Sequence, residues 1–410
     1  MRSSRCLISL AVVALAVAPL RAQNPFAPLV PRFVEGNASE IIAADIFDHI
    51  VYLPVEIGGK GPYSFVLDTG DDAMPVLNES LARSLRIPLG SGRPLTGGAG
   101  STPVELFPID KVDLCLPGVC FGAAPAATLP LDLMDPHWGK HKDGLIGGTV
   151  FSAVVTDIDY ERKTVQFRDP RTSSPPAGEA IPIEVYGQPF VRAKVFLHGA
   201  PEPVEAFMMV DTGVRVTTFN SPFSRQRRLP EQSPRTLATM TGFGVNGETW
   251  GVVGRVRAIQ VGSIRIENPV VTFSTDKAGA ESSDRFAGII GADILHRFHV
   301  VFDYPGKRMT VQANSELGDP SEFDMSGLRL IAEGDRLDVI KIFHVTKQTP
   351  AEAAGMLAGD EIRTIDGRKA STFNWETLRA YLRRPGQSVR LEIVRAGRTI
   401  PIRLTLRRLV

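Results

Sequence analysis

PYSFVLDTG, from Pro62 to Gly70, is the stretch that decides the fold, and AFMMVDTG, from Ala206 to Gly213, repeats it. In each stretch an apolar run of the kind found in buried strands leads directly into Asp-Thr-Gly. A single Asp-Thr-Gly after a strand is a common turn and indicates little. Two copies, each followed later by an apolar-apolar-Gly element, indicate a duplicated structural unit.

Other landmarks of the chain repeat at nearly the same interval. Asp68 and Asp211 are 143 positions apart, and DGLIGG and AGIIGA place Gly144 and Gly288 144 positions apart. A glycine-rich stretch lies between these landmarks in both copies, again at an offset of 144. Landmarks that keep one order and nearly one offset predict two copies of a lobe.

The domain organisation follows from this repeat and from composition. Runs rich in Val, Ile, Phe and Thr, separated by turn residues, predict a mainly β protein: a two-lobed β fold followed by a C-terminal α+β domain. The Pro- and Ser-rich RTSSPPAGE indicates a connector between the lobes. The predicted divisions are a signal peptide at 1–22, a first lobe at 33–170, an interlobe linker at 171–180, a second lobe at 181–312, a linker at 313–326 and the C-terminal domain at 327–410.

The two Asp-Thr-Gly copies, with GLIGG and GIIGA downstream, resemble the retropepsin and pepsin-like aspartic peptidases over roughly residues 33–311. The resemblance implies the acid-protease fold with a crossed-loop core in each lobe. It implies Asp68 and Asp211 as the catalytic pair, peptide or protein substrates, and no metal or other cofactor. Two close carboxylates share a proton, so that one acts as general base on a water and the other as general acid.

The neighbours of the two aspartates follow the same pattern. The resemblance implies that Thr69 and Thr212 brace the two loops across the pair. Gly70 and Gly213 allow the tight backbone turn beneath the carboxylates.

The residues that follow depart from the family pattern, which usually has a small or hydroxyl residue there. This chain has Asp71 and Asp72 after the first copy, and Val214 and Arg215 after the second. Extra acid beside the pair should raise carboxylate pKa values by like-charge repulsion. Arg215 would oppose that effect if it reaches the site. Alternatively, these side chains point outward and have no effect.

The glycine-rich stretches LTGGAG and MTGFG resemble the flap that closes over substrate in this family. Glycines would permit hinge motion and backbone contact with an extended peptide. The alternative is an ordinary hairpin tip. The candidate flap residues are Gly97, Gly98 and Gly100 in the first copy and Gly242 and Gly244 in the second.

The C-terminal segment TPAEAAGMLAGDEIRTIDG resembles PDZ domains of bacterial envelope proteases. The resemblance implies a C-terminal peptide ligand, held by a Gly-apolar loop whose positions match Gly327, Leu328, Arg329 and Leu330. The excess of Lys and Arg over Asp and Glu in 327–410 suits an acidic partner such as a peptide carboxylate. The alternative is a PDZ-like fold that only packs against the lobes.

The N-terminus and the cysteines indicate export. Two arginines, an apolar run and a small residue near position 22 have the form of a secretory signal peptide, the alternative being an uncleaved membrane anchor. The mature protein is therefore expected in the periplasm or secreted. Cys115 and Cys120 flank a Pro-Gly turn and are expected to form a local disulfide, zinc being less favoured because no second cysteine pair exists.

Two functions remain open at the level of sequence. The first is an aspartic endopeptidase with a peptide-recognising module, active as a monomer because one chain carries both aspartates. The second is a catalytically weak or inactive envelope protein that binds peptides. No nucleic-acid motif accompanies the basic C-terminal segment. His137 and His141 have metal-compatible spacing, but their Pro- and Gly-rich surroundings indicate a loop.

Overall fold

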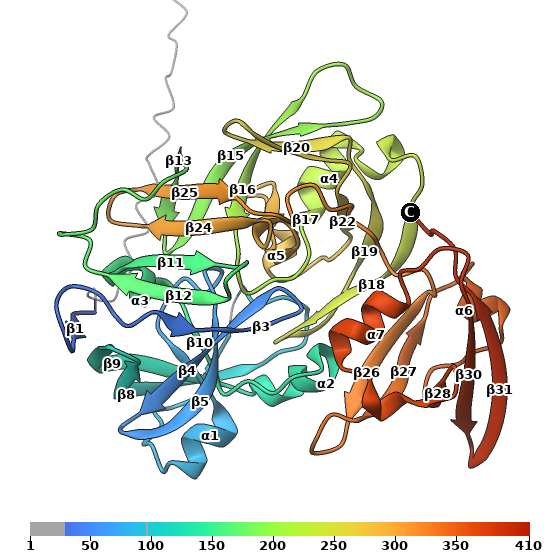
Figure 1. Ribbon diagram of the computed structural model, residues 1–410, viewed down its shortest axis with the longest axis horizontal. Coiled ribbons are helices and arrows are strands. Elements are labelled where there is room, and N and C mark those ends of the chain that lie inside the picture. The colour runs from blue at the N-terminus through green and yellow to red at the C-terminus, as the bar shows by residue number, and fades with distance from the viewer. Residues whose placement is uncertain (1–28, 96) are drawn as a thin grey trace, which may run out of the picture.

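The computed structural model describes residues 29–410, apart from residue 96, and contains two β lobes and a C-terminal module (Figure 1). The prediction of a mainly β, two-lobed fold with an α+β module is confirmed. The predicted signal peptide, 1–22, lies outside the described residues. Within the described part of the chain, no helix has the length and apolar character needed to cross a membrane.

The first lobe is a nine-stranded sheet in which strands distant in sequence interleave. Its central order is β6-β10-β5-β4, where β10 pairs parallel with β5 and antiparallel with β6. The chain leaves β5, loops round, and returns as β6 on the far side of β10. The elements are β1 (Pro31–Phe33), β2 (Ile42–Ala43), β3 (Asp45–Phe47), β4 (Ile50–Ile57), β5 (Lys60–Leu67), β6 (Val76–Asn78), α1 (Glu79–Ser84), β7 (Arg93–Pro94), β8 (Glu105–Leu116), β9 (Val119–Leu129), η1 (Leu131–Met134), α2 (Asp135–Trp138), β10 (Gly144–Ile146), α3 (Gly148–Ala153), β11 (Val155–Asp159) and β12 (Thr164–Arg168).

The second lobe repeats this crossed topology. β23 lies between β16, with which it pairs parallel, and β17, with which it pairs antiparallel. Its elements are β13 (Glu179–Pro182), β14 (Glu184–Tyr186), β15 (Gln188–Phe196), β16 (Val204–Val210), β17 (Thr218–Phe219), α4 (Ser221–Arg227), η2 (Pro230–Gln232), β18 (Leu237–Gly244), β19 (Gly247–Arg255), β20 (Ala258–Val261), β21 (Ile264–Glu267), β22 (Val270–Ser274), η3 (Ala280–Ser282), β23 (Gly288–Ile290), α5 (Ala292–Leu295), β24 (Phe298–Asp303) and β25 (Arg308–Ala313).

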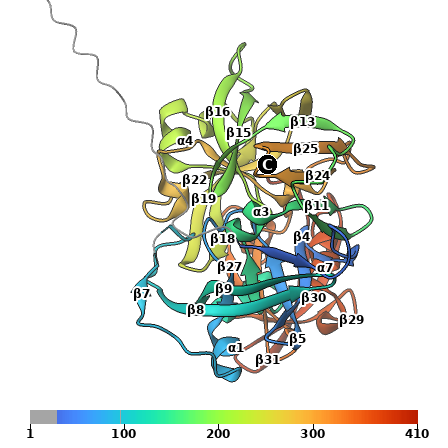
Figure 2. The same ribbon diagram turned by 90° about the vertical axis from the view of Figure 1, so that its left-hand side faces the viewer.

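A six-stranded sheet joins the two lobes, in the order β13-β25-β24-β11-β12-β2. Its central antiparallel pair is β11 of the first lobe with β24 of the second, with Ile158 opposite Val300. Figure 2 shows β25, β24 and β11 stacked along one side of the molecule, between the lobes. Because this pairing is continuous backbone hydrogen bonding, the lobes are held at a fixed spacing beneath the Asp-Thr-Gly loops.

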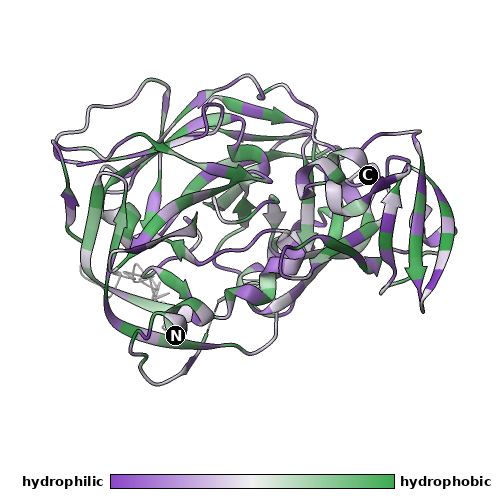
Figure 3. Ribbon diagram, turned by 60° about the horizontal axis from the view of Figure 1, so that its bottom comes forward, coloured by the Kyte–Doolittle hydropathy of each residue, from purple (hydrophilic) through white to green (hydrophobic). Residues whose placement is uncertain are grey.

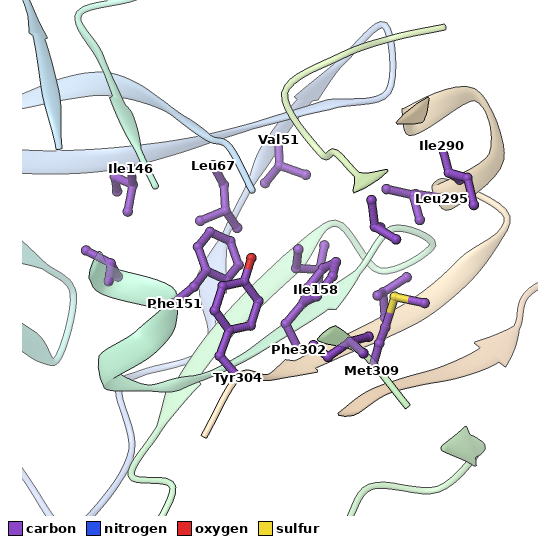
Figure 4. Packing of buried hydrophobic residues seen from close by; sticks show 14 of the residues in the cluster. Val51, Leu67, Ile146, Phe151, Ile158, Ile290, Leu295, Phe302, Tyr304 and Met309 are labelled. Atoms are coloured by element: carbon purple, nitrogen blue, oxygen red, sulfur yellow. The ribbon is translucent and has the colours of Figure 1, made fainter. Parts of the chain in front are cut away.

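A shared apolar core lies under this sheet. The rings of Phe151 and Tyr304, one from each lobe, stack with centroids 5.4 Å apart, and Phe302 meets Phe151 edge-on (Figure 4). Leu67 and Val210, which end the strands directly before the two aspartates, are buried in the same cluster. The apolar runs that precede the two Asp-Thr-Gly motifs therefore fix the loops by burial.

The C-terminal module has a sheet of its own, ordered β26-β27-β28-β30-β31, and a separate apolar core. Figure 3 shows hydrophobic and hydrophilic residues alternating along its outer strands, which matches the alternating burial of β30. The module's elements are β26 (Leu328–Glu333), β27 (Val339–Val345), α6 (Pro350–Ala353), β28 (Glu361–Ile365), β29 (Arg368–Lys369), η4 (Ala370–Thr372), α7 (Trp375–Tyr381), β30 (Ser388–Arg395) and β31 (Arg398–Thr405).

The segments predicted as linkers are more ordered than their composition suggests. β13 begins at Glu179, inside the predicted linker 171–180, because it pairs with β25 in the interlobe sheet. Met325, inside the predicted linker 313–326, is buried in the core of the module. Arg297 of the second lobe donates hydrogen bonds to the carbonyls of Leu317 and Asp319 and so holds this segment against the lobe.

Candidate active site

The two Asp-Thr-Gly loops meet where the crossed strands of each lobe end. Asp68 follows β5 and donates its backbone N–H to the carbonyl of Ile146, and Asp211 follows β16 and donates to Ile290 in the same way. The parallel pairs β5–β10 and β16–β23 place these acceptors beside each aspartate. The crossed topology therefore presents one aspartate from each lobe at the same junction.

Reciprocal threonine hydrogen bonds lock the two loops together. The backbone N–H of Thr69 donates to Oγ1 of Thr212 over 3.1 Å, and the N–H of Thr212 donates to Oγ1 of Thr69 over 3.0 Å. Each hydroxyl in turn donates across the junction, Thr69 to the carbonyl of Val210 and Thr212 to that of Leu67. Both threonines are fully buried, so these bonds are shielded from competing water.

The glycines of the motifs lie against the opposite carboxylates. A Cβ added at Gly70 would lie 2.1 Å from Oδ2 of Asp211, and one at Gly213 would lie 2.3 Å from Cγ of Asp68. The N–H groups of Gly70 and Gly213 each donate over 2.8 Å to the carboxylate two residues earlier. Glycine is therefore required here for the close approach of the two loops.

The environment favours a shared proton. Burial raises the pKa of Asp68, while burial and the charge of Asp68 raise the pKa of Asp211 well above its usual value. The two side chains lie within hydrogen-bonding reach of each other. Burial and the charges of Asp211 and Asp68 raise the pKa of the nearby Tyr304 hydroxyl well above its usual value. The titration belongs to the pair as a unit.

The departures after the motifs take three different positions. Asp71 turns inward against Gly147, and burial and the charge of Asp68 raise the pKa of Asp71 well above its usual value. Asp72 is exposed. Arg215 does not lie at the pair, because its guanidinium bonds the carboxylate of Asp48 over 2.5 Å. Arg215 does not reach the carboxylate pair, so the condition under which it would oppose the acidic neighbours is not met.

The glycine-rich stretches of the two copies meet at their tips. Asn246, between β18 and β19, donates its backbone N–H to the carbonyl of Ala99 and its side-chain amide to the carbonyl of Thr102. Cβ atoms added at Gly98 or Gly100 would lie 2.1 or 2.3 Å from atoms of Asn246.

The other candidate flap residues lie around this contact. A Cβ at Gly244 would lie 2.5 Å from that of Ala99, so this glycine also allows the tips to approach. Gly242 lies within the β18–β19 hairpin and Gly97 on the first loop, where its φ of +91° favours glycine. The two stretches therefore form one closed, hydrogen-bonded contact.

The loop of the C-terminal module differs from the expectation for a free ligand-binding loop. The N–H of Gly327 donates to Oδ1 of Asp324 over 2.6 Å, and the N–H of Leu328 donates to Oγ of Ser326. These donors, expected to hold a ligand's carboxylate, are thus already engaged within the chain. The guanidinium of Arg329 points to the second lobe, where it donates to the carbonyl of Thr241 over 3.1 Å. Leu330 lines the same cavity as Leu328.

The first lobe, the second lobe and the C-terminal module meet around Asp48, and no sequence motif marks this junction. Asp48 is in the turn between β3 and β4, is buried, and pairs with Arg215 of the second lobe and Arg379 of the module. Its backbone N–H donates to Glu376 of the module over 2.6 Å. The two guanidiniums together hold the pKa of Asp48 well below its usual range, although burial alone would raise it. A single exposed-looking Asp in a turn gives no sequence signal for this role.

The corresponding turn of the second lobe packs on the first lobe. Gly187, between β14 and β15, lies against the backbone of Asp72, and Gln188 donates its amide to the carbonyl of Gly70 over 2.6 Å. The β3–β4 turn of the first lobe thus contacts the loop after the second Asp-Thr-Gly, and the β14–β15 turn of the second lobe contacts the loop after the first. The turn from the first lobe is charged and also touches the module, whereas the turn from the second is neutral.

The remaining candidates have structural partners. Cys115 and Cys120 are joined in a disulfide across β8 and β9. His141 and Lys142 both bond the carboxylate of Asp135. In residues 29–410 without residue 96, no three or more His, Cys, Asp or Glu side chains are grouped so as to hold a metal ion.

Two family models match parts of this chain. Residues 53–150 and 194–294 match the family described as aspartyl protease, and residues 322–406 match the family described as PDZ domain. The solved structure of an aspartic proteinase from Irpex lacteus is similar over 69% of this chain and 99% of that chain, with 13% sequence identity and a TM-score of 0.42. No curated protein sequence matches the chain.

Proposed function

We propose that this chain, which combines two aspartyl protease lobes with a C-terminal PDZ domain, is an aspartic endopeptidase. The observation that carries the proposal is the reciprocal fit of Gly70 and Gly213 against the carboxylates of Asp211 and Asp68. That fit, together with the threonine bridges, supports an intact catalytic pair at the junction of the lobes.

In the proposed reaction the pair carries one proton. The ionised carboxylate removes a proton from a water between the two aspartates, and the oxygen of that water bonds to the scissile carbonyl carbon. The protonated carboxyl donates to the carbonyl oxygen, and the pair then returns a proton to the leaving amine as the C–N bond breaks. Thr69 and Thr212 keep both carboxylates in place through their loops, which preserves the geometry that the reaction needs.

The substrate would be an extended peptide that enters when the flap tips part. An apolar groove of about 440 Å³ lies beside the tips and is lined by Phe107 and Pro130 of the first lobe and Phe243 and Val245 of the second. Leu133, which is 56% exposed, lies on the same groove. These residues favour an apolar side chain of the substrate at that position.

The module, the compartment and the assembly belong to the same proposal. The PDZ domain would recognise peptide segments of substrates or regulators, since PDZ domains bind peptides by adding a strand. One chain holds both aspartates, which supports activity as a monomer. The predicted signal peptide supports an exported protein that acts in the periplasm or is secreted.

Hydrolysis of an unfolded protein by the mature chain, from about pH 3 to about pH 8, tests the proposal. Asp68→Asn and Asp211→Asn are each expected to lower the rate by at least about 100-fold, since each removes one half of the acid–base pair. Absence of cleavage by the folded wild type at every pH, with peptides still bound, would favour the peptide-binding protein instead.

A further inference from the structure

The groove of the PDZ domain is turned toward the protease body. A cavity of about 290 Å³ lies between β26 and α7 and is lined on the module's side by Leu328, Leu378 and Leu382. Its opposite wall is formed by the second lobe, including Thr241 of β18 and Val253 of β19. Figure 1 shows α7 and β26 on the side of the module that faces α2 and β18. A peptide in this groove and the docked lobe would therefore compete for the same space.

The hairpin that forms the far wall is the second flap. Its strand β18 contacts the module through a hydrogen bond of 2.7 Å between the hydroxyls of Thr239 and Thr346, both of which are buried. Further along β18, Arg329 of the module donates to the carbonyl of Thr241. On β19, the ring of Trp250 meets His344 of the module edge-on. The module thus contacts both strands of the flap.

Near the tip, one histidine of the first lobe connects flap and module. The ring of His137, on α2, stacks on Phe243 of the flap with centroids 3.7 Å apart, and meets Phe343 of the module edge-on at 4.6 Å. The neighbouring Trp138 donates its indole N–H to the carbonyl of Phe243. Aromatic contacts of this kind add to the stability gained from burial alone.

We infer that the PDZ domain is a latch on the second flap, and that a peptide bound between β26 and α7 releases it. The tip of the flap is joined to the first lobe through Asn246. The strands β18 and β19 behind the tip are the part of the hairpin that the module contacts. The module holds these two strands through the contacts of Thr346, Arg329 and His344. Opening the flap then requires the module to move off the lobe. The inference rests on the proposed function, because the β18–β19 hairpin acts as a flap only if the cleft between the lobes binds a substrate.

Hydrogen exchange tests the latch without reference to activity. In the full mature chain, Thr346→Val with Arg329→Gln is expected to speed exchange of the β18 and β19 amides about tenfold, since each removed hydrogen bond weakens the closed state. Amides of β15 and β16 are expected to be unchanged. Thr364→Val is the matched control, because it removes an exposed hydrogen bond of the module far from the flap. Equal hairpin exchange in the double variant, the control and the wild type would overturn the inference.

A reversible lock provides the second test. The hydroxyl oxygens of Thr239 and Thr346 lie 2.7 Å apart, so the sulfur atoms of cysteines at these positions can be brought together in a disulfide. Oxidised Thr239→Cys/Thr346→Cys is expected to hydrolyse protein, and to bind a pool of random decapeptides, about tenfold less well than the reduced form. Wild type under the same reductant controls for the native disulfide. Equal hydrolysis and binding in both redox states would also overturn the latch. If neither the wild type nor the reduced variant hydrolyses protein, the proposed function fails. The hydrogen-exchange and peptide-binding measurements then still test whether the module holds the β18–β19 hairpin.

Discussion

Gly213 packs so closely on Asp68 that the Cβ of an alanine there would lie 2.3 Å from the carboxylate carbon. The two residues come from different lobes, so the packing of the lobes on each other also fixes the position of the Asp68 carboxylate. A methyl group at position 213 must push either the carboxylate or the whole loop.

Gly213→Ala is therefore expected to lower kcat/KM by at least about 100-fold, because displacing a reacting group by about 1 Å has an effect of that size. The assay is cleavage of an unfolded protein, with circular dichroism to verify folding. Gly318→Ala is the matched control, since an added Cβ there meets nothing within 4 Å. Equal activity in both variants would contradict the role assigned to the close approach.

Thr212→Val tests the bridge between the loops. The substitution leaves the N–H of Thr69 and the carbonyl of Leu67 without the Thr212 hydroxyl in a fully buried site. A loss of about 1–3 kcal/mol in the free energy of unfolding is expected. Urea unfolding measures it, and Thr372→Val, which removes an exposed hydroxyl, should change stability by less than about 0.5 kcal/mol.

Asp48→Asn tests the junction of the three units. The change leaves the guanidiniums of Arg215 and Arg379 close together without the carboxylate that they share. Breaking a largely buried ion pair from one side is expected to lower the stability of the folded chain by about 3 kcal/mol. Calorimetric unfolding is the measurement. Asp338→Asn, which removes an exposed pair with Arg336, is the control and should change stability little.

Part of the pH dependence of the junction should come from His49, in addition to His296 and Asp48, whose pKa values are also lowered. Its ring stacks on that of His296 with centroids 3.8 Å apart, and it faces Asp48, Arg383 and Arg297. Burial, the neighbouring His296 and the arginines lower the pKa of His49 to about 3, against the opposing pull of Asp48. The folded chain thus keeps the ring neutral while the unfolded chain protonates it below its ordinary pKa. Stability is therefore complete above about pH 6.5 and falls as the pH drops toward 3.

His49→Asn should flatten this decline, since asparagine does not titrate and tolerates the φ of +69° at this position. The measurement compares the fall in Tm between about pH 7 and about pH 4.5 in the variant and the wild type. Several buried carboxyls with raised pKa values, including Asp293 at about 6 and Glu281 at about 7, act in the opposite direction in both proteins. An identical decline in both would exclude His49 as its source.

The disulfide stabilises the β8–β9 hairpin of the first lobe. Cys115→Ser with Cys120→Ser should cost about 2 kcal/mol, the value for closing so short a loop in the unfolded chain. Hydrolysis by the folded variant should stay near that of the wild type, because neither cysteine touches the dyad loops. Loss of activity in a variant that remains folded would show that the hairpin also positions the site.

The repeat made much of this architecture predictable from sequence. The family resemblance carried by the two Asp-Thr-Gly motifs implied a crossed core in each lobe, and the structure has β10 and β23 in those places. The loop after each motif was less predictable, because the sequence does not show that the side chain of Asp71 turns inward against Gly147 and that of Arg215 turns away to Asp48. Asp48 gave no signal, since its partners Arg215 and Arg379 lie 167 and 331 positions away in the chain. Contacts of this kind arise from how folded units dock.

The unlike hairpin turns also determine what the two lobes can pair with. By the offset of 143, Asp72 is the counterpart of Arg215. Two copies of the first lobe, arranged as a homodimer, would set Asp48 against Asp72 and so oppose like charges at both ends of the interface. Two copies of the second would leave Arg215 facing the neutral turn at Gly187. Neither lobe therefore suits itself as a partner, and the contacts at the two ends of the interface depend on the two lobes being different.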